Sequence, residues 1–155
     1  MKTFLKILIG SLISYLLMIH FIFRWVCIDG NSMNPTLKNN QHCLLEYYLP
    51  NSKPKVGDIV IFKDPLTLWL GKENQGYCAK RVIATENQTV SMTNGWVYVD
   101  GKMITEMYLL NKNRTKTYIS SAKNPAAGVS FVCGLNEYFV MGDNRGDSGQ
   151  QRRFR

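Results

Sequence analysis

The chain begins with one long apolar stretch, after which short apolar runs alternate with polar turn residues. Residues 7–23 carry no formally charged side chain, and Lys2 and Lys6 precede them. A stretch of this length lies at the lower limit for a membrane-spanning helix, and the residues that follow can extend it through the interface. No small-x-small cleavage site follows, as a removable signal peptide would require. The pattern therefore predicts a cytoplasmic tail over residues 1–6 and a retained transmembrane anchor over residues 7–26.

Beyond the anchor, the pattern predicts a mainly β domain over residues 27–155. The dipeptides Asn94-Gly95 and Asp100-Gly101 supply the positive φ angles that tight hairpin turns need. No helix of convincing period appears outside the anchor. We expect loops over residues 66–76 and 108–129, where polarity is mixed or high. The predicted strands, some with a leading turn, cover residues 41–48, 56–62, 78–84, 89–92, 96–99 and 131–141.

The composition narrows the choice of partners. The formal net charge of +8 is spread thinly along the 155 residues, and no nucleic-acid recognition motif accompanies it. Attraction to an anionic bilayer surface explains a basic domain beside a membrane anchor, so we do not expect nucleic acid as a partner. The four cysteines form no C-x-x-C pair and no metal-ligand spacing with the two histidines. Disulfides, which an exported domain permits, and buried free thiols both stay open.

A serine and a lysine provide the candidate chemistry. Ser32 lies in Gly30-Asn31-Ser32-Met33-Asn34-Pro35, shortly after the anchor, where a plain turn serine is the simpler interpretation. Lys80 lies in the strand-like segment Tyr77-Cys78-Ala79-Lys80-Arg81-Val82-Ile83. Because burial disfavours the charged form, a lysine among apolar neighbours has a lowered pKa and can accept a proton from a serine. Ser–Lys pairs are an established arrangement of nucleophile and base.

Together with Gly142-Asp143-Asn144-Arg145-Gly146-Asp147-Ser148, these two segments resemble the type I signal peptidases, a family of membrane-anchored serine proteases. The resemblance implies that Ser32 is the nucleophile, Lys80 the general base and Ser148 the group that orients the lysine amine. It also implies an antiparallel β-barrel or coiled-sheet domain and a reaction that needs no metal or other cofactor. Arg81 points to the opposite face of the strand from Lys80, because β side chains alternate, and this suits Asp143 as its ionic partner.

The resemblance also gives expectations for the substrate site. Gly30 stands where some family members carry a hydroxyl residue that donates to the oxyanion. With glycine there, we expect the backbone N–H of Ser32 to supply most of that stabilisation. A shallow apolar pocket beside the pair would accept small substrate side chains. The expected pocket residues are Met33, Leu37, Cys78 and Ala79.

Two departures from the family pattern concern the end of the chain. Gln150 stands where family members usually carry an aspartate that supports the loop with an arginine, here Arg152. Family members usually continue with a further strand, whereas this sequence stops at Arg155. We therefore expect a pared-down fold, a truncated relative, or a partner chain that completes the C-terminal edge.

Taken with the anchor, the resemblance predicts a membrane-bound serine endopeptidase that removes signal peptides from exported precursors and cuts after small residues. We expect a single-pass protein of the bacterial inner membrane with an extracytoplasmic catalytic domain, whose partners are precursors and the lipid bilayer. A dedicated peptidase for a pilin or conjugation precursor, and an inactive relative that only binds precursors, are the alternatives. A self-cleaving regulator of the LexA type uses the same chemistry, but the anchor and the lack of a DNA-binding helix pair argue against it.

Overall fold

The computed structural model describes residues 2–47, 52–63, 77–109, 129–146 and 152–154. The chain divides into two compact units. The smaller unit contains Met1–Asp29 and Asn40–Lys53, and the larger unit contains Gly30–Asn39 and Pro54–Arg155. The loop expected over residues 66–76, and most of the loop expected over residues 108–129, lie outside the described residues.

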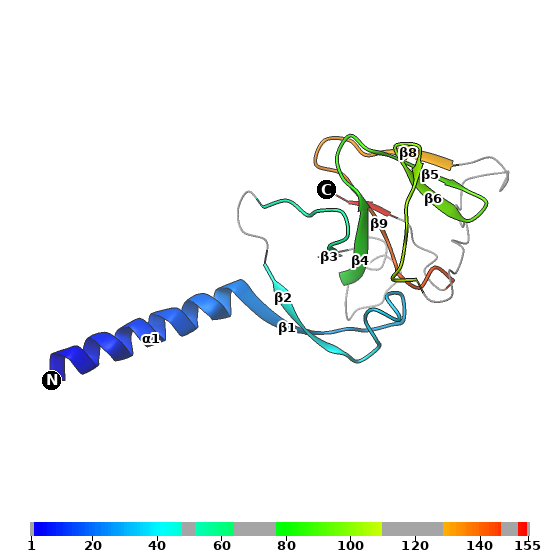
Figure 1. Ribbon diagram of the computed structural model, residues 1–155. Helices are drawn as coiled ribbons and strands as arrows, with labels where there is room; N and C mark the ends of the chain where they lie inside the picture. Colours follow the sequence, from blue (N-terminus) through cyan, green and yellow to red (C-terminus); the bar gives the residue numbers. More distant parts are fainter. Residues whose placement is uncertain (1, 48–51, 64–76, 110–128, 147–151, 155) are drawn as a thin grey trace. The chain divides into compact units, whose positions relative to one another are not determined.

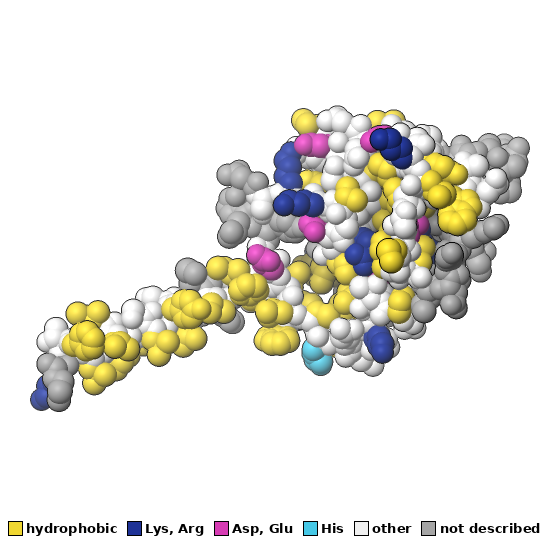
Figure 2. All heavy atoms as spheres, in the orientation of Figure 1, with side chains coloured by type: hydrophobic (Ala, Val, Ile, Leu, Met, Phe, Trp, Pro, Cys, Tyr) yellow, Lys and Arg dark blue, Asp and Glu magenta, His cyan; other side chains and the backbone are white. Residues whose placement is uncertain are grey.

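The smaller unit consists of a helix that leads into a two-stranded hairpin (Figure 1). Helix α1 runs over Lys2–Ile22, and strands β1 (Phe23–Cys27) and β2 (His42–Glu46) pair antiparallel. Apolar side chains follow the helix along its length, as the yellow spheres in Figure 2 show, and most of those described are exposed. The helix therefore presents an apolar surface.

The predicted anchor over residues 7–26 is wrong at its C-terminal boundary, because residues 23–26 belong to β1. Aromatic and β-branched residues in this segment favour an extended backbone, and pairing with β2 gives its backbone groups hydrogen-bond partners. The Ile28 N–H continues the pairing by donating to the Gln41 carbonyl at 2.9 Å. Within the part of the chain that the structure describes, no helix combines the length and the apolar character that crossing a bilayer requires. This finding goes against the transmembrane helix that the sequence predicted.

The larger unit contains two four-stranded antiparallel sheets (Figure 1). The first, in the order β10-β9-β4-β3, consists of β3 (Ile59–Lys63), β4 (Tyr77–Ala84), β9 (Tyr138–Met141) and β10 (Arg152–Phe154). The second, in the order β7-β6-β5-β8, consists of β5 (Thr89–Thr93), β6 (Trp96–Val99), β7 (Lys102–Met103) and β8 (Val129–Val132). The predicted antiparallel, mainly β architecture is confirmed. Each sheet has two end strands, so the described strands do not close into the expected barrel.

Both faces of the sheet formed by β3, β4 and β9 are buried. One face packs with residues of the second sheet into a cluster that includes Ile83 and Phe139. The other face carries a smaller cluster of Val60, Val82 and Val140, together with Tyr138. Burial on both faces explains why the end of β4 and all of β9 are uninterrupted apolar runs, since a sheet with one face in solvent would show alternation.

The two glycine-containing turns form as predicted. Asn94 and Gly95 have φ angles of 52° and 83° between β5 and β6, and Asp100 and Gly101 have 50° and 76° between β6 and β7. The Asp100 carboxylate also accepts a hydrogen bond from the Thr89 N–H at 2.8 Å, which ties the second turn to β5. Sequence alone locates these turns because a positive φ depends on the turn residues themselves.

Two other expectations about strands need correction. The strand expected over residues 131–141 is divided between β8 and β9, which belong to different sheets. Between them, the Cys133 N–H donates to the Gln88 carbonyl at 2.9 Å and Asn136 adopts a φ of 57°, so the chain turns a corner there. At the C-terminal edge, β10 pairs with β9, and Arg152 lies opposite Val140. The chain itself therefore supplies a strand at this edge, for which the sequence left a pared-down fold, a truncated relative and a partner chain open.

The four cysteines, all of which the structure describes, are free thiols. Cys27 lies opposite His42 in the hairpin, and Cys43 lies opposite Val26. Adjacent register positions point to opposite faces of the hairpin, so these two thiols do not approach each other. Cys133 is the buried one of the four. Of the two alternatives that the sequence left open, the structure contains the free thiols.

Candidate active site

Ser32 occupies a tight turn in the larger unit. The Asn34 N–H donates to the Asn31 carbonyl at 3.1 Å, and the Leu37 N–H donates to the Met33 carbonyl at 3.0 Å. The Met33 side chain is 1% exposed, whereas Ser32 keeps part of its surface accessible. The turn is therefore anchored by its buried methionine and presents the serine toward the surface.

Gly30 allows the chain to enter this turn. Its φ of +95° lies in the region that L side chains rarely adopt, although a Cβ would meet no other atom there. Its N–H donates to the Asn39 Oδ1 at 2.8 Å, which closes the base of the loop. Backbone conformation, and not lack of space, therefore favours glycine at the position where the sequence suggested a missing hydroxyl donor.

Lys80 lies in the middle of β4 and is 3% exposed. It pairs in register with Val60 on β3, and alternation along β4 places Val82 on the same face. Val60 and Val82 belong to the smaller apolar cluster. Burial among apolar side chains of this kind disfavours a charged ammonium group, because the group loses its hydration. The desolvated lysine that the sequence predicted is therefore present.

Arg81, the next residue, lies on the other face of β4. Its Nε and Nη2 donate to the two carboxylate oxygens of Asp143 at 2.9 and 2.6 Å, and its Nη1 donates to the Gly57 carbonyl at 2.8 Å. Its guanidinium carbon stands 4.2 Å from the centre of the Tyr108 ring. The hydrogen bond to Asp143 raises the pKa of Arg81. The predicted pairing of Arg81 with Asp143 is confirmed.

The turn after β9 connects the serine loop to the sheet of the lysine. The Asn144 N–H donates to the Ser32 carbonyl at 3.0 Å, and the Asn144 side-chain amide donates to the Asn31 carbonyl at 3.1 Å. The Thr36 hydroxyl donates to the same Asp143 carboxylate that binds Arg81. This turn follows β9, which pairs with β4. Within the described residues, hydrogen bonds therefore link Ser32 to the strand of Lys80 through this turn.

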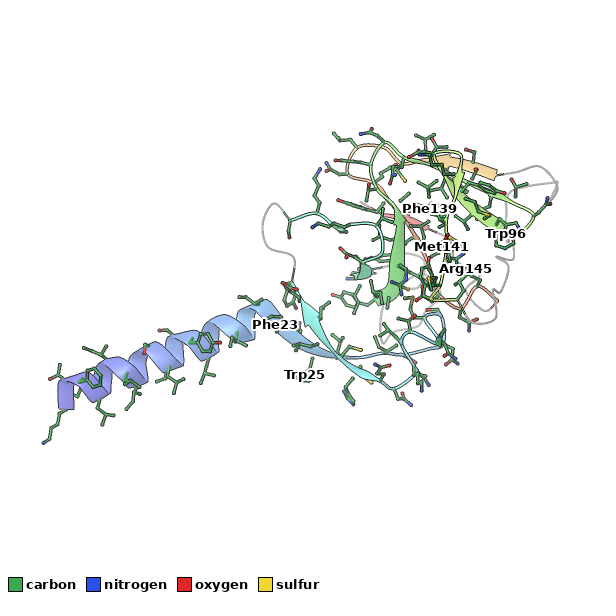
Figure 3. All side chains as sticks on the ribbon, viewed as in Figure 1. Phe23, Trp25, Trp96, Phe139, Met141 and Arg145 are labelled. Atoms are coloured by element: carbon green, nitrogen blue, oxygen red, sulfur yellow. The ribbon has the colours of Figure 1, made fainter. Side chains whose placement is uncertain are left out.

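Arg145 stiffens the turn from within. It is 2% exposed, and Figure 3 shows it beyond Met141, the last residue of β9. Its Nε donates to the Gly142 carbonyl at 3.0 Å, and its Nη1 donates to Glu106 Oε2 at 3.0 Å. The Tyr108 hydroxyl donates to the other Glu106 oxygen at 2.7 Å. Sequence reasoning missed Glu106 and Tyr108, and the one signal that pointed to them was an acidic and an aromatic residue close behind the second hairpin turn.

The remaining predicted site residues are only partly brought together. Met33 is too buried to offer surface to a substrate, whereas Leu37, Cys78 and Ala79 are partly exposed. Cys78 shares the face of Lys80, whereas alternation along β4 places Ala79 on the other face. Ser148 lies outside the described residues. Among the described residues, no three His, Cys, Asp or Glu side chains gather as a metal site would require.

Comparison with known proteins gives concordant matches. The family described as Signal peptidase, peptidase S26, matches residues 1–154. A probable signal peptidase I-1 from Synechocystis is 34% identical over 152 residues, which cover 95% of this chain and 70% of that protein. Signal peptidase I S from Bacillus subtilis is 32% identical over 153 residues, which cover 95% of this chain and 76% of that protein. A crystal structure of a signal peptidase I from Enterococcus faecalis matches with a TM-score of 0.45 and 27% identity, over 63% of this chain and 82% of the other.

Proposed function

We propose, for a chain that belongs to the signal peptidase family of S26 peptidases, that Ser32 and Lys80 form the catalytic pair. Family membership, with relatives over most of the chain, makes the protein a serine peptidase that removes signal peptides. The observation that carries the assignment of the pair is the burial of Lys80, 3% exposed, in the sheet whose β9 turn holds the Ser32 carbonyl.

In the proposed reaction, Ser32 Oγ attacks the scissile carbonyl carbon while Lys80 Nζ accepts the hydroxyl proton. The tetrahedral intermediate collapses with loss of the C–N bond, and the Lys80 ammonium gives the proton to the leaving amine. Water then attacks the acyl-enzyme ester with Lys80 again as base. The ester C–O bond breaks, the Lys80 ammonium returns the proton to Ser32 Oγ, and the acyl product leaves as a free acid. The apolar neighbours of Lys80 support this role, because they exclude water and favour the neutral amine.

We assign the oxyanion to the backbone N–H of Ser32, since Gly30 has no side-chain donor to offer. Such a donor is effective when its direction is set before the substrate arrives. The bond from the Asn144 N–H to the Ser32 carbonyl supports this, because it restrains the residue that carries the donor. Ser148 keeps the lysine-orienting role that the motif suggests, and Asp143 and Arg81 support the turn from the other face.

We expect the precursor to bind in an extended conformation beside the catalytic pair, with small residues before the cut. Leu37 in the serine turn and Cys78 on the Lys80 face each keep part of their surface exposed, which supports a shallow apolar pocket. Specificity for a single pilin or conjugation precursor has no dedicated feature in the described residues, so a panel of precursors decides between general and dedicated use.

We also propose that helix α1 contacts a lipid bilayer and that the catalytic unit faces the extracytoplasmic side. Phe4 is 70% exposed and Ile7 is 67% exposed, and contiguous apolar surface of this kind marks lipid or protein contacts. Lys2 and Lys6 on the same helix would attract anionic headgroups. Protease added to intact spheroplasts should then digest the catalytic unit. If the catalytic unit is digested only after lysis, the proposed orientation is wrong.

The decisive experiment uses the full chain in lipid and a precursor with a small-x-small cleavage site. We expect cleavage by the wild type and none by Ser32→Ala, whereas Ser130→Ala, a change at an exposed serine on β8, should cleave normally. Cleavage by Ser32→Ala would refute the nucleophile. Precursor binding by the wild type without any cleavage would favour an inactive precursor-binding protein.

A further inference from the structure

Resting on the proposed catalytic pair, we propose that Glu106 is a positioning residue, which holds the Ser32 turn in place against the strand of Lys80. Glu106 lies a few residues beyond β7, far from both in sequence. Its two carboxylate oxygens bind the Arg145 guanidinium, and one of them also accepts the Tyr108 hydroxyl hydrogen bond at 2.7 Å. Glu106 is therefore the carboxylate on which two other side chains converge.

Glu106 holds the buried guanidinium group of Arg145. Arg145 is 2% exposed, so its charge needs a carboxylate within the protein. With Glu106 in place, the Arg145 Nε stays directed at the Gly142 carbonyl, 3.0 Å away. Glu106 thus decides where Arg145 lies, and Arg145 restrains Gly142.

Gly142 is linked to both proposed catalytic residues. Met141 pairs in register with Arg81, the residue after Lys80, and Gly142 directly follows Met141. Two residues later, the Asn144 N–H donates to the Ser32 carbonyl at 3.0 Å. A displacement of Gly142 therefore changes the spacing between the serine and the lysine.

Tyr108 binds Glu106 through its hydroxyl, and its ring centre lies 4.2 Å from the Arg81 guanidinium carbon. One short segment thus contacts the guanidinium groups of both Arg81 and Arg145. Burial raises the pKa of Tyr108, and the neighbouring Glu106 charge adds to the effect. The hydroxyl therefore keeps its proton, and its bond to Glu106, at the pH of ordinary assays.

The test separates positioning from simple stabilisation. Glu106→Gln keeps the shape and can still accept from Tyr108, but it lacks the charge that holds Arg145. We expect kcat of the folded enzyme to fall by about 10–100-fold, as small displacements of reacting groups do, with KM changed by less than about threefold. The control is Glu137→Gln. The Glu137 carboxylate accepts a hydrogen bond from the Gly134 N–H in another turn, and its loss of charge should leave kcat at the wild-type value.

The double variant Glu106→Leu with Arg145→Met separates a loss of positioning from a loss of stability. It removes both members of the buried pair, so stability should return, but the Gly142 carbonyl loses its donor. We expect a melting temperature near that of the wild type with kcat still low. Recovery of kcat along with stability would overturn the inference.

Amide exchange supplies a measurement that does not depend on activity. In Glu106→Gln, the Asn144 N–H should exchange at least about tenfold faster, because its restraint on the Ser32 carbonyl is loosened. Unchanged exchange, or unchanged kcat in an active wild type, would overturn the role of Glu106 and leave the catalytic pair intact. Faster exchange in a protein whose wild type does not cleave would support the positioning and refute the proposed reaction.

Discussion

The two faces of β4 hold neighbouring basic side chains in opposite surroundings. Lys80 shares its face with Val60 and Val82 and is 3% exposed. Arg81, one residue later, has a side chain that is 12% exposed, with the Asp143 carboxylate 2.6 Å away. Both side chains are largely removed from water, so their difference lies in the neighbours each face provides.

This difference shows how one strand supplies both a proton-accepting lysine and an arginine that forms a structural ion pair. The hydrogen bond to Asp143 raises the pKa of Arg81 and holds it as a permanent cation. The apolar face around Lys80 disfavours a charge, which is the condition for a lysine to accept a proton. Strict alternation of side chains keeps the two environments apart although the residues are adjacent. The following changes test this contrast, in order of decreasing effect.

The largest effect should come from Lys80. Lys80→Ala should lower kcat on the order of 10⁴–10⁶-fold, as loss of a base from a paired catalytic unit does. Lys80→Arg should lose comparable activity, because a guanidinium keeps its proton at any assay pH. Single-turnover cleavage measures both. The Ser32→Ala/Lys80→Ala double variant should be no worse than either single variant, and substantial activity of Lys80→Ala at neutral pH would show that the base is misassigned.

Loss of the ion pair on the Arg81 face should lower the free energy of unfolding. Asp143→Asn leaves Arg81 without its counter-charge, and breaking a buried pair in this way costs about 3–5 kcal/mol. Denaturant unfolding measures the loss. Thr36→Val is the matched control, since it removes the hydrogen bond from an uncharged hydroxyl to the same carboxylate and should cost about 1.5 kcal/mol, the lower end for a bond to a charged group. Equal losses for the two variants would mean that the charge on Arg81 is not what Asp143 stabilises.

The free energy of unfolding at alkaline pH should depend on Tyr108, the aromatic partner of Arg81. The folded protein raises the pKa of Tyr108 above its ordinary value of 10.0, so the folded state binds this proton more tightly than the unfolded state. The corresponding stability is fully present below about pH 10 and is lost as the pH rises further, at up to about 1.4 kcal/mol per pH unit. Tyr108→Phe should flatten this part of the stability curve, and an identical slope in the variant would refute the assignment.

We expect the smallest effect on activity from one substitution on each face of the sheet. Val60 lies opposite Lys80, and Ile59 lies opposite Arg81. Val60→Thr puts a hydroxyl beside the lysine, so it should shift the acid limb of the kcat/KM profile to higher pH and cost about 1–3 kcal/mol. Ile59→Thr should leave the acid limb where it is in the wild type. A matching shift in both variants would show that the profile does not depend on the face of Lys80.

Much of the fold could be predicted from local signals. Asn94-Gly95 and Asp100-Gly101 specify their own turns, and β4 was correctly expected because its β-branched residues favour extended backbone. The errors arose where pairing partners decide the outcome. Residues 23–26 look like the end of an apolar helix until β2 pairs with them. Residues 131–141 look like one strand until two sheets divide them.

For the site, the sequence by itself determined the two residue types that the chemistry needs, and the alternation that sends Lys80 and Arg81 to opposite faces. The tertiary structure decided what each of them meets. Glu106 joins Arg145 across 39 positions, and Asn144 reaches Ser32 across more than a hundred. Local conformation follows from the residues of a turn or strand, whereas the partner of a buried charge follows from the path of the whole chain, which brings distant carboxylates and guanidinium groups together to avoid leaving either charge buried alone.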